Sequence, residues 1–206
     1  MRYVYIHGLG SVGGALLKRL ERMRKRGLLE FLLVGASDST GHFWMNDIMG
    51  GEAVIHDIIA RKNSNPRGLA GVSESECLGK GSLSKVSSLD LVGRLNALTA
   101  LASARVLFVD ASAVDSSALF EKLLSQTGDS LKIITANKVP LSGPWEISST
   151  LFSPQNIARI GAEATVGAGV PMIRSLVCHR ELADGEFSVD AVLSGTLSCI
   201  ASGVET

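Results

Sequence analysis

Apolar positions along this 206-residue chain follow two different periods. Short apolar runs rich in β-branched and aromatic residues indicate buried strands, and apolar residues three or four positions apart indicate helices. Strands are predicted at residues 2–7, 31–36, 105–110, 131–135, 157–161 and 187–193, and helices at 15–25, 51–62, 88–102, 115–126 and 172–182. The alternation of strand and helix favours an α/β fold with a parallel, doubly wound sheet.

The stretch 41–104 is the least regular part of the chain. Residues 63–85 are rich in Asn, Ser, Gly and Pro, which predicts an exposed loop. For His42, Phe43 and Trp44 we expect packing in the core or in a loop. The predicted helix at 88–102 has one apolar stripe, expected to be buried, which consists of Leu91, Leu95, Leu98 and Leu101.

Composition narrows the class of protein. Lys plus Arg equals Asp plus Glu at 20 each, which gives no electrostatic reason to expect binding to nucleic acid or an acidic membrane. No apolar run approaches the roughly 18 residues of a membrane span, and the first strand leaves no room for a signal peptide. The 3 cysteines have no metal-ligand spacing, which is typical of free thiols in a reducing compartment. We therefore expect a cytoplasmic protein.

A glycine motif with the spacing G-x-G-x-x-G lies between the first strand and the first helix. Its members are Gly8, Leu9, Gly10, Ser11, Val12 and Gly13. In such a motif the first glycine allows the tight turn, the second leaves room for a pyrophosphate, and the third lets the helix approach the strand. The helix then offers free N–H groups to the phosphates. The motif predicts a dinucleotide site, and the alternative is a tight turn without a ligand.

Asp38 follows the second strand, where a dinucleotide-binding fold places a carboxylate against the adenosine ribose. That role would favour NAD, because the carboxylate would repel a 2′-phosphate. Ser39 and Thr40 could instead bind a 2′-phosphate, so NADP stays open. A third interpretation is that Asp38 only closes the strand in a turn.

Two further residues lie at carboxyl ends of strands, where open α/β sheets bind ligands. Ser112 follows the strand at 105–110, and Lys138 follows the strand at 131–135. The charge of Lys138 could hold a reacting oxygen or the nicotinamide region, although a purely structural role is equally open.

The segment 163–171 contains two glycines and a proline between a strand and a helix. Such a loop can hold a phosphate with its N–H groups or a hard cation with its carbonyl groups. The hydroxyl-rich residues 194–198 follow the last predicted strand, where a substrate could bind.

Five segments in a fixed order resemble homoserine dehydrogenase, in the form also found fused to aspartate kinase. They are GLGSVGGALL near the start, VDASA at 109–113, TANKVPLSG at 135–143, EATVGAGVPMI at 163–173 and LSGTLSCI at 193–200. The resemblance implies a Rossmann-type NAD(P)-binding domain over residues 1–143. An incomplete α+β substrate and dimerisation domain would occupy residues 144–206.

The resemblance also implies a function, the reduction of L-aspartate 4-semialdehyde to L-homoserine with NADPH or NADH, on the way to threonine, methionine and isoleucine. The glycine motif and Ser112 would hold the coenzyme, and Lys138 would lie between coenzyme and substrate, assisting proton transfer. Gly195 and Thr196 would contact the substrate. A monovalent cation, Na⁺ or K⁺, would bind backbone carbonyls of Glu163, Val166, Ala168 and Val170.

The chain departs from the family pattern near its end. Cys199 stands where the family commonly has an aromatic residue, and Glu205 lies near the place of a substrate-binding glutamate. The family's later acidic residues and second catalytic lysine would follow Thr206. We therefore expect impaired activity and a weakened family homodimer. The alternative is an inactive relative that only binds a dinucleotide, and the order of the five segments disfavours a different dehydrogenase.

Overall fold

The computed structural model describes residues 2–45, 58, 62, 68–71, 83–101, 103–167, 170–182, 185 and 188–190. Seven strands form one mixed sheet in the order β4-β3-β2-β1-β5-β6-β7. The strands are β1 (Arg2–His7), β2 (Leu32–Asp38), β3 (Gly41–Met45), β4 (Leu83–Val86), β5 (Arg105–Asp110), β6 (Leu131–Thr135) and β7 (Ile160–Gly161).

The parallel part of the sheet contains β2, β1, β5, β6 and β7. Central strand β1 pairs in parallel with both β2 and β5, and the parallel pairing continues through β6 to β7. These strands read as nearly continuous apolar runs because helices cover both of their faces. The predicted α/β fold with a doubly wound parallel sheet is confirmed for these five strands.

The other edge of the sheet was not predicted. β3 turns back directly from β2 and pairs with it antiparallel, and β4 pairs antiparallel with β3. The prediction of a loop at 63–85 is therefore wrong at its end, where β4 begins at Leu83. The prediction for Phe43 and Trp44 is confirmed, because both side chains are buried.

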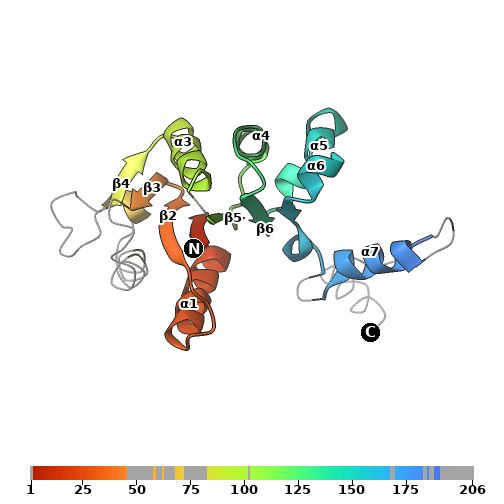
Figure 1. The fold of residues 1–206 in the computed structure, drawn as a ribbon, viewed down its shortest axis with the longest axis horizontal. Helices are drawn as coiled ribbons and strands as arrows, with labels where there is room; N and C mark the ends of the chain where they lie inside the picture. The colour runs from red at the N-terminus through yellow and green to blue at the C-terminus, as the bar shows by residue number, and fades with distance from the viewer. Residues whose placement is uncertain are drawn as a thin grey trace, which may run out of the picture.

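The described helices lie on both sides of the sheet. Figure 1 shows α1 on one side and α3, α4, α5 and α6 on the other. The helices are α1 (Ser11–Lys25), α3 (Ser88–Thr99), α4 (Ser117–Gln126), α5 (Trp145–Leu151), α6 (Pro154–Ile157) and α7 (Met172–Leu182). Of the helix expected at 51–62, the structure describes only Ile58 and Lys62, and both are helical.

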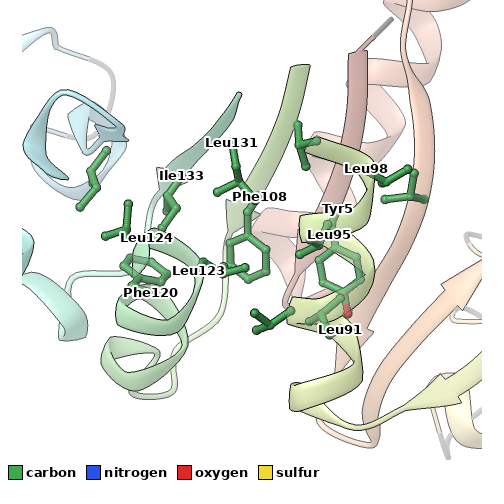
Figure 2. Packing of buried hydrophobic residues seen from close by; sticks show 14 of the residues in the cluster. Tyr5, Leu91, Leu95, Leu98, Phe108, Phe120, Leu123, Leu124, Leu131 and Ile133 are labelled. Atoms are coloured by element: carbon green, nitrogen blue, oxygen red, sulfur yellow. The ribbon is translucent and has the colours of Figure 1, made fainter. Parts of the chain in front are cut away.

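The core has two halves, one on each face of the sheet. On the face covered by α3 and α4, Tyr5 stacks on Phe108 at a centroid distance of 5.6 Å, and Phe120 meets Phe108 edge-on (Figure 2). On the other face Leu17 packs with alternate strand residues such as Val4 and Ile6. Because side chains alternate between the two faces of a strand, β1 contributes residues to both halves of the core.

The stripe predicted on α3 is confirmed for the three buried side chains of Leu91, Leu95 and Leu98. It is wrong for Leu101, which is 50% exposed because the helix ends at Thr99. The helix begins at Ser87, whose hydroxyl oxygen accepts a hydrogen bond from the backbone N–H of Asp90. Such a cap satisfies one of the N–H groups that the first turn leaves unpaired.

The sheet continues beyond residue 143, where we expected the cofactor domain to end, because β7 pairs with β6. Buried Arg159 joins this edge to the rest of the fold. Its guanidinium donates to the carbonyl oxygens of Leu131 and Leu124 and to the hydroxyl of Thr127. The part of the chain after residue 143 therefore contributes a strand to the same sheet.

Beyond β7 the described chain forms a short 3₁₀ turn at Glu163–Thr165 and then the helix α7, as predicted at 172–182. Of the strand expected at 187–193 the structure describes only 188–190, which are not in a strand, so that prediction is wrong for these three residues. Cys178 is an exposed free thiol, in line with the sequence analysis. Within the described ranges, no helix combines the length and the apolar character needed to cross a membrane.

Candidate functional site

The glycine motif forms the tight turn between β1 and α1. Gly8 has a φ of +89°, and a Cβ built on it would lie 2.6 Å from the backbone nitrogen of Ser112. A Cβ on Gly13 would overlap the carbonyl oxygen of Gly8. Any side chain at these two positions would therefore push apart the ends of β1, α1 and β5.

The start of α1 is free to receive an anion. Among the described residues, none accepts a hydrogen bond from the N–H groups of Ser11 and Val12, and the first turn contains no acidic residue. A Cβ on Gly10 would meet nothing within 4 Å. Free N–H groups, the positive end of the helix dipole and an open approach together form the kind of site that binds a phosphate.

A surface cavity of about 470 Å³ lies beside this loop. Its lining includes Leu9, Gly10 and Ser11 of the glycine motif together with Ile58 and Lys62. Lys18 on α1 also lines it, so two ammonium groups border the cavity. The cavity is therefore large enough and positive enough for a phosphorylated ligand.

Ser112 lies at the end of β5, directly against Gly8. Its backbone N–H donates to the carboxylate of Asp110, which is completely buried. The amide of Asn137 reaches the same group from β6, donating to Asp110 Oδ2 at 3.1 Å, to Ser112 Oγ at 3.2 Å and to the carbonyl oxygen of Val114 at 2.7 Å. Asp110, Ser112 and Asn137 form what we call the β5–β6 cluster, which joins two strand ends.

Lys138 follows Asn137 and is exposed. The side-chain oxygen of Asn137 accepts the N–H of Val139, and buried Pro140 continues the short turn at Val139–Leu141. Within the described part of the chain no acidic group forms an ion pair with Lys138. Its ammonium group is therefore available to a ligand at the carboxyl end of β6.

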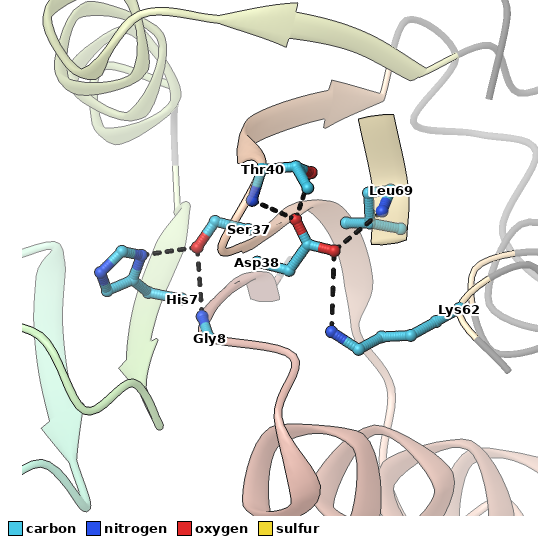
Figure 3. A network of polar contacts seen from close by, with 7 residues as sticks. All are labelled: His7, Gly8, Ser37, Asp38, Thr40, Lys62 and Leu69. Carbon is cyan, nitrogen blue, oxygen red and sulfur yellow. Dashed lines mark hydrogen bonds and ion pairs between the residues drawn. The ribbon is translucent and has the colours of Figure 1, made fainter. Parts of the chain in front are cut away.

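Asp38 lies in a separate polar cluster at the end of β2 (Figure 3). Its Oδ1 accepts hydrogen bonds from the backbone N–H and the hydroxyl of Thr40. Its Oδ2 accepts from the N–H of Leu69 at 2.8 Å and lies 3.7 Å from Lys62 Nζ. We call these four residues the Asp38 cluster. A carboxylate has about four acceptor positions. Three of them receive hydrogen bonds inside the protein, and Lys62 faces the carboxylate at ion-pair distance.

The surroundings of Asp38 favour its ionised carboxylate. Burial by itself would raise its pKa, but the hydrogen bonds from Thr40 and Leu69 and the charge of Lys62 outweigh burial and lower it. Its negative charge is thus compensated by the protein. The turn interpretation of Asp38 fits this geometry, which disfavours a bond to a ribose hydroxyl.

Sequence reasoning missed a third group, which lies behind the glycine motif. His7 Nδ1 is 2.6 Å from the hydroxyl of Ser37, and the His7 ring stacks on the ring of His42 at 5.3 Å. Burial lowers the pKa of both histidines; nearby Asp110 opposes the shift for His7, and the charge of His7 adds to it for His42. The only signal in the sequence was a histidine in the last position of a buried strand.

The segment expected to bind a cation begins after β7. The carboxylate of Glu163 accepts the N–H groups of Ile173 and Arg174 and so caps the start of α7. The carbonyl oxygen of Val170 accepts the N–H of Met172. Val166 is described, whereas Ala168 lies outside the described residues. Among the described His, Cys, Asp and Glu side chains, no three come together as a metal site.

The structure thus brings the glycine motif, Ser112 and the segment 137–139 to one edge of the sheet. Asp38 and its partner Lys62 lie at the end of β2, on the opposite side of β1 from β5. The residues expected to contact the substrate, Gly195 and Thr196, lie outside the described residues.

Comparison with solved structures finds similar folds. A hyperthermophilic archaeal homoserine dehydrogenase in complex with NADPH is 21% identical, with a TM-score of 0.55 over 85% of this chain and 48% of that chain. Homoserine dehydrogenase from Thermoplasma acidophilum is 22% identical, with a TM-score of 0.57 over 88% of this chain and 49% of that chain. A Candida auris protein of unknown function is 21% identical, with a TM-score of 0.54 over 86% and 43% of the two chains.

These likenesses show that the chain has the fold of part of these homoserine dehydrogenases, and that it spans about half of their length. Comparison with models of protein families finds no match. Comparison with curated proteins finds no match either.

Proposed function

We propose that the protein is an NAD(P)-dependent oxidoreductase of the homoserine dehydrogenase type, which reduces L-aspartate 4-semialdehyde to L-homoserine. The observation that supports it most is the start of α1. There two N–H groups are free among the described residues, the space beside Gly10 is open, and the first turn contains no acidic residue. This arrangement fits a diphosphate. Its position between β1 and β5 is the point where α/β sheets change direction and bind dinucleotides.

In this proposal each strand end has one task. The bound nicotinamide would supply the hydride. Ser112, held by the β5–β6 cluster, would contact the nicotinamide half of the coenzyme. Lys138 would stabilise the negative charge that develops on the aldehyde oxygen and assist its protonation. Gly195 and Thr196 would contact the amino acid part of the substrate, as the resemblance implies.

For the coenzyme we propose a preference for NADPH over NADH. The carboxylate of Asp38 already accepts three hydrogen bonds inside the protein and faces Lys62 at 3.7 Å, which disfavours a role as acceptor for a ribose hydroxyl. Lys18 and Lys62 border the adjoining cavity and could receive a 2′-phosphate. Two positive charges beside an occupied carboxylate favour the phosphorylated ribose.

The coenzyme preference is tested with Lys62→Met and the control Lys132→Met, which removes an exposed lysine of β6. We expect Lys62→Met to weaken NADPH binding about tenfold, the value of one charge-assisted hydrogen bond, and to leave NADH binding unchanged. Dissociation constants from coenzyme fluorescence give the comparison. Equal losses for both coenzymes would disprove the preference.

We also propose that the backbone carbonyls of Glu163, Val166, Ala168 and Val170 hold Na⁺ or K⁺. Carbonyl oxygens are suitable ligands for hard cations, and the Val170 carbonyl keeps one lone pair after its bond to Met172. A higher melting temperature in Na⁺ or K⁺ than in a choline salt of equal ionic strength would support the site. Identical melting in all three salts would refute it.

The activity is tested by following NADPH oxidation in the presence of aspartate 4-semialdehyde. We expect turnover by the wild-type protein and a loss of about 100-fold or more in Lys138→Met, with NADPH affinity within about threefold. NADPH binding without turnover would replace the enzyme with a dinucleotide-binding module. A protein that bound neither coenzyme would refute the whole proposal.

The family's homodimer, proposed here as well, can be checked by sedimentation.

A further inference from the structure

We propose that His7 is a positioning residue for the coenzyme, because it orients the hydroxyl of Ser37, and Ser37 holds the first peptide groups of the glycine motif. The inference rests on the proposed dinucleotide site and adds to it a residue that acts through another side chain. His7 Nδ1 lies 2.6 Å from Ser37 Oγ, and both residues are buried.

Ser37 controls the beginning of the loop through three hydrogen bonds, of which Figure 3 draws the one between its hydroxyl and Gly8. Its carbonyl oxygen accepts the N–H groups of Gly8 at 3.1 Å and Leu9 at 2.8 Å. Its hydroxyl oxygen accepts the N–H of Gly8 as well, at 3.1 Å. Because Gly8 also lies tightly against Ser112, a shift of Ser37 would move the loop relative to the start of α1.

The hydroxyl of Ser37 needs a fixed orientation for this role. A serine hydroxyl can rotate, and it can both donate one hydrogen bond and accept others. Since its oxygen already receives the N–H of Gly8, its own hydrogen requires an acceptor. A neutral His7 with its hydrogen on Nε2 offers Nδ1 as that acceptor. The chain of donors then runs from Gly8 N–H to Ser37 Oγ and from Ser37 O–H to His7.

The surroundings of His7 keep its ring in place and uncharged. The ring is stacked between His42, at 5.3 Å, and Phe108, at 5.7 Å. His42 Nδ1 in turn lies 3.1 Å from the hydroxyl of Tyr5, at hydrogen-bond distance. Burial lowers the pKa of His7, while nearby Asp110 acts in the opposite direction. A neutral imidazole is therefore the form that Ser37 meets at neutral pH.

The test compares His7→Leu with His7→Asn. Both changes remove the ring and its stacking on His42 and Phe108, and the two new side chains have similar size. Only Asn offers an acceptor near the former position of Nδ1. We expect the dissociation constant for NADPH to rise about tenfold in His7→Leu, as for one lost hydrogen bond, and to stay within about threefold of wild type in His7→Asn.

A double-mutant cycle with Ser37→Ala tests whether His7 acts through Ser37. We expect Ser37→Ala to weaken NADPH binding and His7→Leu to add nothing in its presence, because the two residues form one unit. His179→Leu is the control. That histidine is exposed on α7, and its ring nitrogen lies 2.8 Å from a backbone oxygen of its own helix, the carbonyl of Ser175. Its removal should leave the affinity unchanged.

Three results would overturn the inference while leaving the proposed function intact. They are equal losses in His7→Leu and His7→Asn, additive losses in the cycle, or unchanged affinity in Ser37→Ala. The last variant keeps the histidine ring, so it decides the question even if His7→Leu does not fold. A wild-type protein that bound no dinucleotide would overturn both the proposed function and the role of His7.

Discussion

Two aspartates at the carboxyl edge of the sheet have the same place in the topology and different surroundings. Asp110 ends β5 and binds the next strand end through Asn137, inside a fully buried cluster. Asp38 ends β2 and binds Thr40, the distant turn at Leu69, and Lys62. The first aspartate joins parts of the proposed active site, and the second compensates a lysine beside it. The position of a carboxylate at the end of a strand therefore does not by itself show that it binds a ligand. Its partners within the protein have to be known first.

The largest effect is expected for Asn137→Leu. The change removes an amide nitrogen whose two hydrogens are shared among three acceptors, and it leaves the buried Oδ2 of Asp110 without the bond from Asn137. We expect the free energy of unfolding to fall by about 3–4 kcal/mol in denaturant titrations. Asn156→Leu removes a single hydrogen bond, which the side-chain amide donates to the carbonyl oxygen of Thr150. This change should cost less than about 1.5 kcal/mol. Similar losses would show that the β5–β6 cluster is not specially important.

A smaller effect is expected for Asp38→Asn. The new amide has a single acceptor oxygen, so it cannot accept from both Thr40 and Leu69, and it carries no charge to compensate Lys62; the turn at 68–71 can, however, separate from the sheet and meet water. We expect a loss of about 1–2 kcal/mol. Asp90→Asn at the start of α3 is the control, expected within about 0.5 kcal/mol of wild type because Asp90 is exposed. A loss as large as that of Asn137→Leu would remove the distinction between the two aspartates.

The dependence of stability on pH should show two steps, one from His7 and His42 and one from Asp38. His7 lies in the sheet between the two aspartates, because β1 pairs with both β2 and β5. Burial lowers the pKa values of His7 and His42, so the unfolded chain takes up protons first as pH falls through the ordinary histidine value of 6.5. Stability is therefore full above that pH and declines below it. Asp38 has a pKa below its ordinary value of 3.8, so its contribution is lost only in stronger acid.

Denaturant midpoints measured from neutral to acid pH should show these two steps. His7→Asn should flatten the step near the histidine range, and Asp38→Asn should flatten the acid step. A protein whose stability stayed constant down to the carboxylate range would contradict the histidine assignment.

The smallest effect on stability is expected for a change at Lys138, the sequence neighbour of Asn137. Lys138→Gln alters an exposed side chain beside Asn137, and we expect the free energy of unfolding to change by less than about 0.5 kcal/mol. Thermal and chemical unfolding measure this directly. A large loss would show that Lys138 supports the fold, and its proposed role toward the substrate would need a new basis.

Strands buried on both faces were predictable because their apolar runs are continuous, as in RYVYIH and RVLFVD. β3 was missed because it begins with Gly and His directly after the Asp38 turn, and β4 because its sequence LSKV has two polar residues between its apolar ends, within a polar stretch. The start of α1 was predictable because its chemistry depends on glycine spacing. Asn137 was not, because its partners lie 23 to 27 positions earlier in the chain. Asp38 was ambiguous for the same reason, since Lys62 and Leu69 are remote in sequence.

The guanidinium of Arg159 has a consequence for local opening of the molecule. A strand of two residues at the edge of a sheet would ordinarily fray. Here the arginine beside it is fastened to the end of α4 and to β6, and its own carbonyl oxygen receives the N–H of Ile133. The edge therefore belongs to the same cooperative unit as the central strands. Its amide hydrogens should exchange with solvent only when that whole unit opens.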